Sequence, residues 1–81
     1  MAVKIDKIPQ MVRFHRKRSG LTQLELGQLA GVGKTAVFDV ERGKITVQWA
    51  TLVKILHVLN IQIHFESPLM NEFEEKDHEK G

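Results

Sequence analysis

At 81 residues the chain is long enough for one domain with a modest hydrophobic core, and too short for a second folded unit or a deep catalytic cleft. Without cysteine it has no disulfide framework and no thiolate metal site, so packing, within one chain or between copies, must stabilise the fold. No apolar run approaches the roughly 20 residues that cross a bilayer, and the first ten residues lack a signal-peptide stretch, so we expect a soluble, cytoplasmic protein with no membrane partner.

The formal net charge of +2 conceals an uneven distribution along the chain. Residues 1–60 contain ten basic and four acidic residues, a net charge of +6, whereas residues 61–81 contain two basic and six acidic residues, a net charge of −4. Because the local field rather than the total charge steers a partner, a basic body followed by an acidic tail favours a module that binds a polyanion. Solvated surface charge gives the same pattern, so charge alone leaves both interpretations open.

The first predicted helix starts near Ile8, after an N-terminal arm of residues 1–7. Pro9 is well tolerated at a first helical position, and three side chains recur at helical spacing, Ile8, Val12 and His15. Ser19-Gly20 ends the helix. His15 lies on its inner face, where we expect a hydrogen bond to the backbone or to a carboxylate. The helix also contains a basic cluster in which we expect Arg16 to be engaged in the fold and the others to face solvent or a DNA backbone: Arg13, Arg16, Lys17 and Arg18.

Two short helices follow, joined by a glycine-containing turn. Thr22 is a good N-cap for a helix over residues 23–30, which the sequence Gly31-Val32-Gly33 breaks. A third helix runs from Lys34 to Glu41 or Arg42, with Gly43 where a helix C-terminal glycine belongs. Four apolar side chains are expected to hold the pair against its neighbours: Leu26, Ala30, Val37 and Val40. Two helices joined in this way form a helix-turn-helix unit, whose second helix is presented to the DNA major groove.

The rest of the chain predicts a fourth helix, a strand and a tail. The helix begins near Thr46 to Gln48, ends at a left-handed Asn60, and carries one apolar face that we expect to be core, namely Trp49, Leu52, Leu56 and Leu59. Over residues 61–66 apolar and polar residues alternate, which is typical of a half-buried strand. Residues 67–81 are acidic and sparse in large apolar residues, which predicts a flexible tail, although Leu69, Met70 and Phe73 could dock on a partner.

A single strand needs a partner for its backbone hydrogen bonds. The simplest partner is the same strand of a second copy, which would bury Ile61, Ile63 and Phe65 across a two-fold axis. Pairing within the chain, with Val3-Lys4-Ile5, and a frayed end are the alternatives. We therefore expect a homodimer.

The stretch from Leu21 to Gly43, LTQLELGQLAGVGKTAVFDVERG, resembles the Cro/repressor type of helix-turn-helix regulators, the Xre family. The matching positions are Gly20-Leu21-Thr22-Gln23, Leu26, Gly31-Val32, Val37 and Glu41-Arg42-Gly43. The resemblance covers residues 8–60 and implies an all-α, lambda-repressor-like DNA-binding domain of four to five short helices, here with a C-terminal β-strand that pairs across a homodimer. It implies a sequence-specific transcriptional repressor that binds double-stranded DNA at a palindromic operator.

The resemblance also implies roles for individual residues. The outward positions of the recognition helix, which contact base edges, are Lys34, Thr35, Phe38 and Asp39; the phosphate contacts are Gln23, Arg42 and Lys44; and Arg16 and Glu41 match a structural ion pair between the first and third helices. Asp39 is unexpected there, because a carboxylate repels phosphate unless it accepts a hydrogen bond from a cytosine amino group, and it could instead pair with Lys34 or Arg42. Phe38 would touch a thymine methyl or pack. Gly27 stands where alanine is usual, and Gly33 replaces the usual Ser or Thr cap.

The strand after the fourth helix is similar to that of HipB-type antitoxins, whose C-terminal strands pair across the dimer. This resemblance implies autorepression of an operon and binding to a HipA-type serine/threonine kinase toxin. A stand-alone Xre regulator without a toxin, and a protein-binding adaptor that never grips DNA specifically, are the alternatives. We predict no enzymatic activity, cofactor or metal site, because no histidine stands three or four residues from another and GVGK is only a fragment of a phosphate-binding loop.

Overall fold

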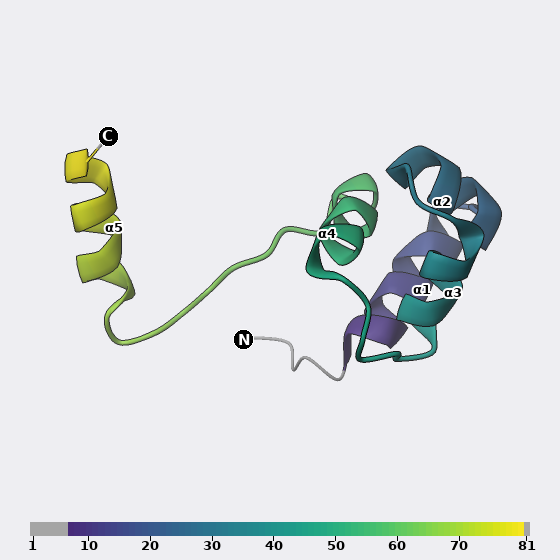
Figure 1. Cartoon of the computed structure of the whole chain (residues 1–81), viewed down its shortest axis with the longest axis horizontal. Helices are drawn as coiled ribbons and strands as arrows, with labels where there is room; N and C mark the ends of the chain where they lie inside the picture. Colours follow the sequence, from purple (N-terminus) through teal and green to yellow (C-terminus); the bar gives the residue numbers. More distant parts are fainter. Residues whose placement is uncertain (1–6, 81) are drawn as a thin grey trace.

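The computed structural model describes the backbone of residues 7–80 and the side chains of residues 7–77. Within this part of the chain it contains helices and no strand: α1 (Ile8–Arg18), α2 (Gln23–Ala30), α3 (Lys34–Glu41), α4 (Trp49–Val58) and α5 (Met70–Lys80). Helices α1 to α4 pack into one bundle, and α5 stands apart from it at the end of an extended connection (Figure 1). None of the described helices is long and apolar enough to span a membrane. The N-terminal arm, with Val3-Lys4-Ile5, lies outside the described residues except for Lys7.

Helices α1 to α4 begin and end at or near the predicted local signals. Thr22 and Glu25 form a capping box, in which Thr22 Oγ1 accepts a hydrogen bond from the Glu25 backbone N–H at 3.1 Å and Glu25 Oε1 accepts one from the Thr22 N–H at 2.9 Å. These bonds lower the pKa of the Glu25 carboxyl. Gly31 and Gly43 follow α2 and α3 with φ of +72° and +83°, and Asn60 follows α4 with φ of +58°. The predicted helix ends at these residues are therefore confirmed.

The core lies where α1 to α4 meet. Its buried side chains come from all four helices: Val12, Leu26, Val37, Val40, Ile55, Leu56 and Leu59. The prediction that Trp49 belongs to this core is wrong, because its side chain is 60% exposed. Trp49 is the first residue of α4, whose buried residues, Ile55 and Leu56, lie in the second half of the helix.

The segment after α4 differs from its prediction in two ways. Residues 61–67 form an extended connection, as a strand would (Figure 1), but join no strand within the described residues, and the Ile61 N–H donates to the Leu56 carbonyl at 2.9 Å. Pairing of Ile63 and Phe65 with a second copy therefore stays a prediction. Residues Met70–Lys80 form the helix α5, which the sequence analysis did not predict, and the flexibility of residues 67–81 stays a prediction. Helix formation there has a local cause, since Met, Glu and Lys have high helix propensity and Glu72 lies in the first turn, where a negative charge favours the helix dipole.

Gly27 is the position at which α2 comes closest to the turn that leads into α3. A Cβ atom there would lie 2.9 Å from the Val32 carbonyl oxygen and 3.2 Å from the carbonyl carbon and oxygen of Gly33. The same contact is fixed by a hydrogen bond of 2.8 Å from the Val32 N–H to the Gly27 carbonyl. The alanine that is usual in the resembling family therefore does not fit this backbone, and the close approach requires glycine.

Gly27→Ala is expected to destabilise the protein. The gain of about 1 kcal/mol in helix propensity is opposed by backbone displacement against Val32 and Gly33, which costs about 1–3 kcal/mol in overpacked sites, so the midpoint of thermal unfolding should fall by several degrees. Circular dichroism melting measures this shift. Gln28→Ala, on the exposed side of the same helix, is the matched control and should change the midpoint little. A Gly27→Ala midpoint at or above that of the wild type would contradict this account of the turn.

Candidate nucleic-acid interface

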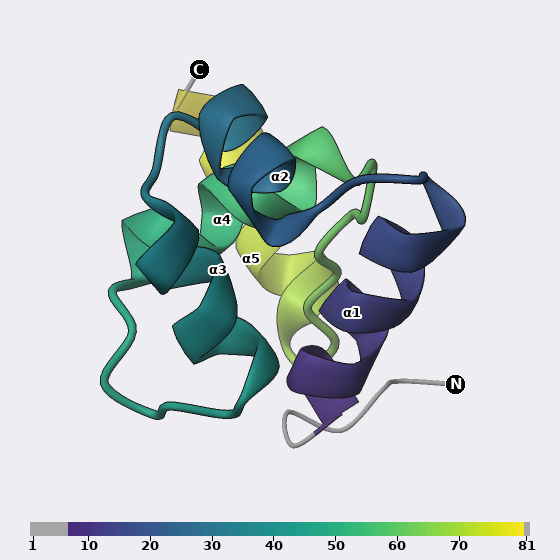
Figure 2. The same ribbon diagram turned by 90° about the vertical axis from the view of Figure 1, so that its right-hand side faces the viewer.

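Helix α3 has one buried edge and one exposed edge. Val37 and Val40 are buried at 0% and 4% exposure and hold α3 against the bundle. Lys34, Thr35 and Phe38 are exposed on the other side, and the Phe38 side chain is 51% exposed although it is large and apolar. Figure 2 views the molecule from the side of α1, α2 and α3. Three of the four predicted base-contacting residues therefore share an exposed edge of α3, whereas Asp39 is half-buried.

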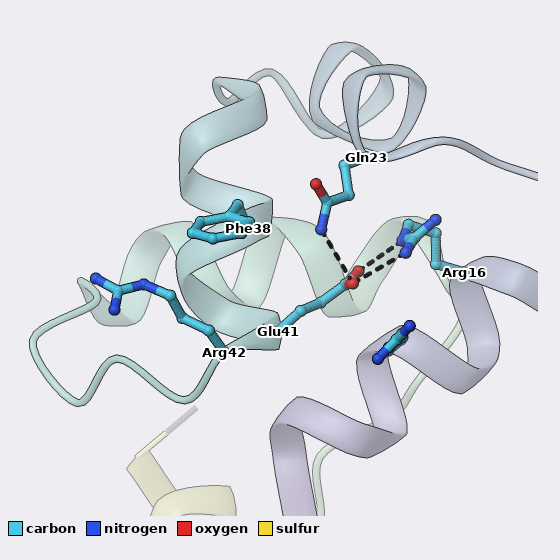
Figure 3. A pocket seen from close by; sticks show the side chains of 6 residues that line it. Arg16, Gln23, Phe38, Glu41 and Arg42 are labelled. Atoms are coloured by element: carbon cyan, nitrogen blue, oxygen red, sulfur yellow. Dashed lines mark hydrogen bonds and ion pairs between the residues drawn. The ribbon is translucent and has the colours of Figure 1, made fainter.

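Arg16 and Glu41 form the buried ion pair that ties α1 to α3. Arg16 Nε lies 2.6 Å from Glu41 Oε2, Arg16 Nη2 lies 3.0 Å from Oε1, and the side chains are only 11% and 5% exposed (Figure 3). Arg16 Nη1 also donates to the carbonyl of Leu21 at 2.8 Å, just before α2. The hydrogen bond to Glu41 raises the pKa of Arg16, which stays charged. One guanidinium thus connects α1, the entry to α2 and the end of α3.

Gln23 joins the same network from the start of α2. Its Nε2 donates to Glu41 Oε1 at 3.3 Å, and its side chain is half-buried (Figure 3). An amide NH₂ group has two N–H donors, so this bond leaves a second donor for the phosphate contact predicted from the sequence. The first residue of α2 is therefore oriented by the ion pair that also orients α3.

The half-buried carboxylate of Asp39 is paired with Arg42 and Lys44, two residues that the sequence analysis assigned to phosphate contacts. Arg42 Nε donates to Oδ1 at 3.1 Å, and Lys44 Nζ lies 3.5 Å from Oδ2. The hydrogen bond from Arg42 is the main reason that the pKa of the Asp39 carboxyl is lowered. Of the two partners considered for Asp39 from the sequence, the structure brings Arg42 to it and not Lys34. Lys44 is a partner that the sequence analysis did not name, because it lies beyond the helix at a turn whose geometry depends on Gly43.

An open hollow of about 350 Å³ separates α1 from α3 on this side of the molecule. Its lining comes from α1, α2, α3 and the residue after α3, namely Arg13, Arg16, Gln23, Phe38, Glu41 and Arg42 (Figure 3). Arg13 is exposed and stands one helical turn before Arg16, so it reaches the face that bears Phe38 and Arg42. The sequence placed Arg13 in a basic cluster but did not predict which way its side chain points. Arg18 instead lies over Phe14, with 5.6 Å between its Cζ and the ring centre.

The histidine that was expected on the inner face of the first helix makes a hydrogen bond within that helix. His15 Nδ1 lies 2.6 Å from the carbonyl oxygen of Met11, one turn earlier in α1, as the backbone alternative predicted. Within the described residues, no group of three or more histidine or acidic side chains is arranged to hold a metal ion.

Glu41→Ala is expected to destabilise the protein by about 3 kcal/mol, because it leaves the Arg16 guanidinium buried without its counter-charge. The double variant Arg16→Met with Glu41→Leu should recover most of this loss, since it removes both charges and keeps apolar volume. Urea unfolding gives both free energies. Asp39→Asn, which changes a more exposed ion pair, is the control and should change the free energy of unfolding little. If Glu41→Ala matches the wild type, or if the double variant is the least stable of all, the pair does not have this role.

Comparisons with known proteins identify the family. A family model described as "Helix-turn-helix" matches residues 12–65, which contain most of α1 and all of α2, α3 and α4. The chain is also similar to the uncharacterized HTH-type transcriptional regulator y4mF of Sinorhizobium fredii, with 38% identity over 61 residues that cover 75% of this chain and 80% of that protein. With this match and the geometry of α2, its turn and α3, the chain belongs to the Xre-type family of helix-turn-helix proteins.

Proposed function

We propose that the protein is a sequence-specific transcriptional regulator that places α3 in the major groove of double-stranded DNA. The exposed edge of α3, formed by Lys34, Thr35 and Phe38, carries this proposal, because the opposite edge of the helix is buried in the bundle. The major groove is about 12 Å wide and accepts an α-helix. The relative in Sinorhizobium fredii is described as a transcriptional regulator, which supports the same function here.

The charges around α3 support a DNA-facing surface. The two acidic side chains of α3 are both paired with cations, Glu41 with Arg16 and Asp39 with Arg42 and Lys44. Arg13 and Lys34 are exposed on the same side of the molecule, and neither has an ion-pair partner within the described residues. The face therefore keeps an excess of positive charge, which favours a phosphate backbone.

In this proposal, the residues divide into two sets with different consequences. Lys34, Thr35 and Phe38 contact base edges, with Phe38 against a thymine methyl, whereas Gln23, Arg42 and Lys44 were assigned to phosphates by the family resemblance. Phosphate contacts set position and salt dependence, and base contacts set the preferred sequence.

The dimer is a second part of the proposal, supported by the segment after α4. Ile63 and Phe65 are exposed by 39% and 67%, and the backbone around them is extended. Ile61, the third predicted dimer residue, instead packs against the core of its own chain. Pairing of residues 61–66 between two copies would cover Ile63 and Phe65 and place two recognition helices about 34 Å apart on a palindromic operator.

The narrower proposal is that this regulator is the autorepressing antitoxin of a HipA-type kinase toxin. It rests on the form of the segment after α4, together with Leu69 and Phe73, which are more than 60% exposed and offer an apolar surface to a partner. Coexpression with a HipA-type kinase tests it, since an antitoxin relieves growth arrest and a stand-alone regulator does not.

Selection from random duplex DNA with the full chain should enrich one sequence with two-fold symmetry. On that sequence, Lys34→Ala should relax the preference at one base pair in each half-site, because it removes a base contact. Lys44→Ala should weaken binding to matched and scrambled sequences by a similar factor, because it removes a phosphate contact, and should make the dependence of affinity on salt shallower. Uniform losses for both variants would contradict the division of roles. An adaptor would show neither enrichment nor a steep salt dependence.

The proposed dimer predicts that Ile63→Asp together with Phe65→Asp yields a monomer in sedimentation experiments, because charges opposite each other across a two-fold axis repel. The monomer should also lose affinity for a palindromic site by far more than for a half-site. Ile45→Asp is the control, because Ile45 is 96% exposed and lies outside the segment. A wild-type chain that sediments as a monomer at micromolar concentration, or a double variant that remains dimeric, would contradict the pairing.

A further inference from the structure

The carboxylate of Asp39, on a helix that is proposed to face DNA, has no role in the division of contacts given above. Its Oδ1 accepts a hydrogen bond from Arg42 Nε at 3.1 Å, and its Oδ2 lies 3.5 Å from Lys44 Nζ. The side chain is only 17% exposed, because these cations cover it. Both oxygens of Asp39 are therefore paired with cations of the protein itself. The shorter of its two contacts is the hydrogen bond from Arg42, whose guanidinium it orients.

Arg42 is held on a second side by Phe38, four residues earlier. The Arg42 Cζ lies 5.8 Å from the centre of the Phe38 ring, within the range at which a cation is attracted to an aromatic face. Figure 3 shows both side chains on the part of α3 away from Arg16. The Arg42 side chain remains 53% exposed. The guanidinium is therefore fixed at Nε by a carboxylate and on one face by a ring, while its outer edge meets solvent.

That outer edge consists of Nη1 and Nη2. Within the described part of the chain, neither atom donates a hydrogen bond to the protein. Two N–H groups in one plane match either the O6 and N7 acceptors of guanine or two phosphate oxygens. Asp39 favours guanine, because a phosphate on this edge would approach a carboxylate of the same charge, whereas the guanine edge is neutral. Lys44 Nζ lies at the longer distance of 3.5 Å from Asp39, and its flexible stem lets the ammonium turn away from the carboxylate toward a phosphate.

We propose that Arg42 recognises a guanine in the major groove and that Asp39 and Phe38 are positioning residues for its guanidinium. The inference rests on the proposed insertion of α3 into the groove. It moves Arg42 from the phosphate contacts, where the family resemblance placed it, to the base contacts, and it adds the contact with Arg42 to the thymine contact proposed for Phe38. A guanidinium that is already held in place loses less conformational freedom on binding. The two positioning residues therefore orient the Arg42 guanidinium and also increase its selectivity for guanine.

The test uses the full chain and the palindromic duplex that it selects. Each guanine of a half-site is replaced in turn by 7-deazaguanine, which lacks the N7 acceptor and leaves base pairing intact. We expect one replacement to weaken wild-type binding about tenfold, as for the loss of part of a bidentate contact. Arg42→Met should bind the normal duplex more weakly and lose less than about twofold further at that replacement, because a thioether has no N–H donor for guanine O6 or N7.

Asp39→Asn and Phe38→Leu test the positioning roles. Both variants should reduce the penalty at the same guanine, and Asp39→Asn should also bind random duplex more tightly because it removes a negative charge. Lys54→Ala, an exposed cation on α4, is the control and should leave the penalty unchanged. Thermal melting confirms that each variant is folded, and Asp39→Glu, which keeps the charge, should restore part of the penalty.

The outcomes separate the alternatives. If Arg42→Met weakens binding to the normal and the substituted duplex by the same factor, so that the replacement costs as much affinity as in the wild type, Arg42 contacts phosphate and the proposal is overturned. If only Arg42→Met removes the penalty, Arg42 recognises the guanine and the positioning roles of Asp39 and Phe38 are wrong. If the wild type enriches no sequence, the proposed function itself fails at the selection step, before any guanine is replaced.

Discussion

The buried ion pair between Arg16 and Glu41 fixes the helix on which the proposed function depends. Helices α2 and α3 have eight residues each, and helices of this length are marginal by themselves in water. Their orientation comes from the tertiary contacts of Val37 and Val40 and from the guanidinium of Arg16, which bonds both to Glu41 and to the chain entering α2. A buried ion pair is a weak source of net stability, but its geometry restricts how two elements can pack. Here it sets the direction of α3 relative to α1.

The same pairing shapes the charge of the exposed face. Glu41 is covered by Arg16, and Asp39 is covered by Arg42 and Lys44, so the carboxylates of α3 do not present an unpaired negative charge beside Lys34. Most of the other acidic residues of the chain lie after residue 60, in the extended segment and α5. Figure 1 shows this acidic region apart from the bundle. The positive charge from which the sequence analysis inferred a polyanion partner thus lies in the bundle.

The sequence predicted those features that have a local cause. Thr22 caps α2, Gly31 and Gly43 adopt left-handed conformations after helices, and the spacing of Leu26, Val37 and Val40 identifies buried faces. Features that depend on where an element begins or on distant neighbours were missed. Trp49 shares the apolar spacing of α4 but lies in its first turn, outside the core, and residues 70–80 form a helix although their composition cannot build a core. The contact between Lys44 and Asp39 required the turn at Gly43, which spacing alone does not describe.

The central claim, that the outward edge of α3 enters the major groove twice in a paired molecule, is tested most directly by methylation interference on the selected duplex. Dimethyl sulfate methylates guanine N7 in the major groove and adenine N3 in the minor groove. The account predicts that methylated guanines block binding in two clusters, related by two-fold symmetry and separated by about one helical turn. Interference confined to adenines, or a single cluster without symmetry, would contradict it.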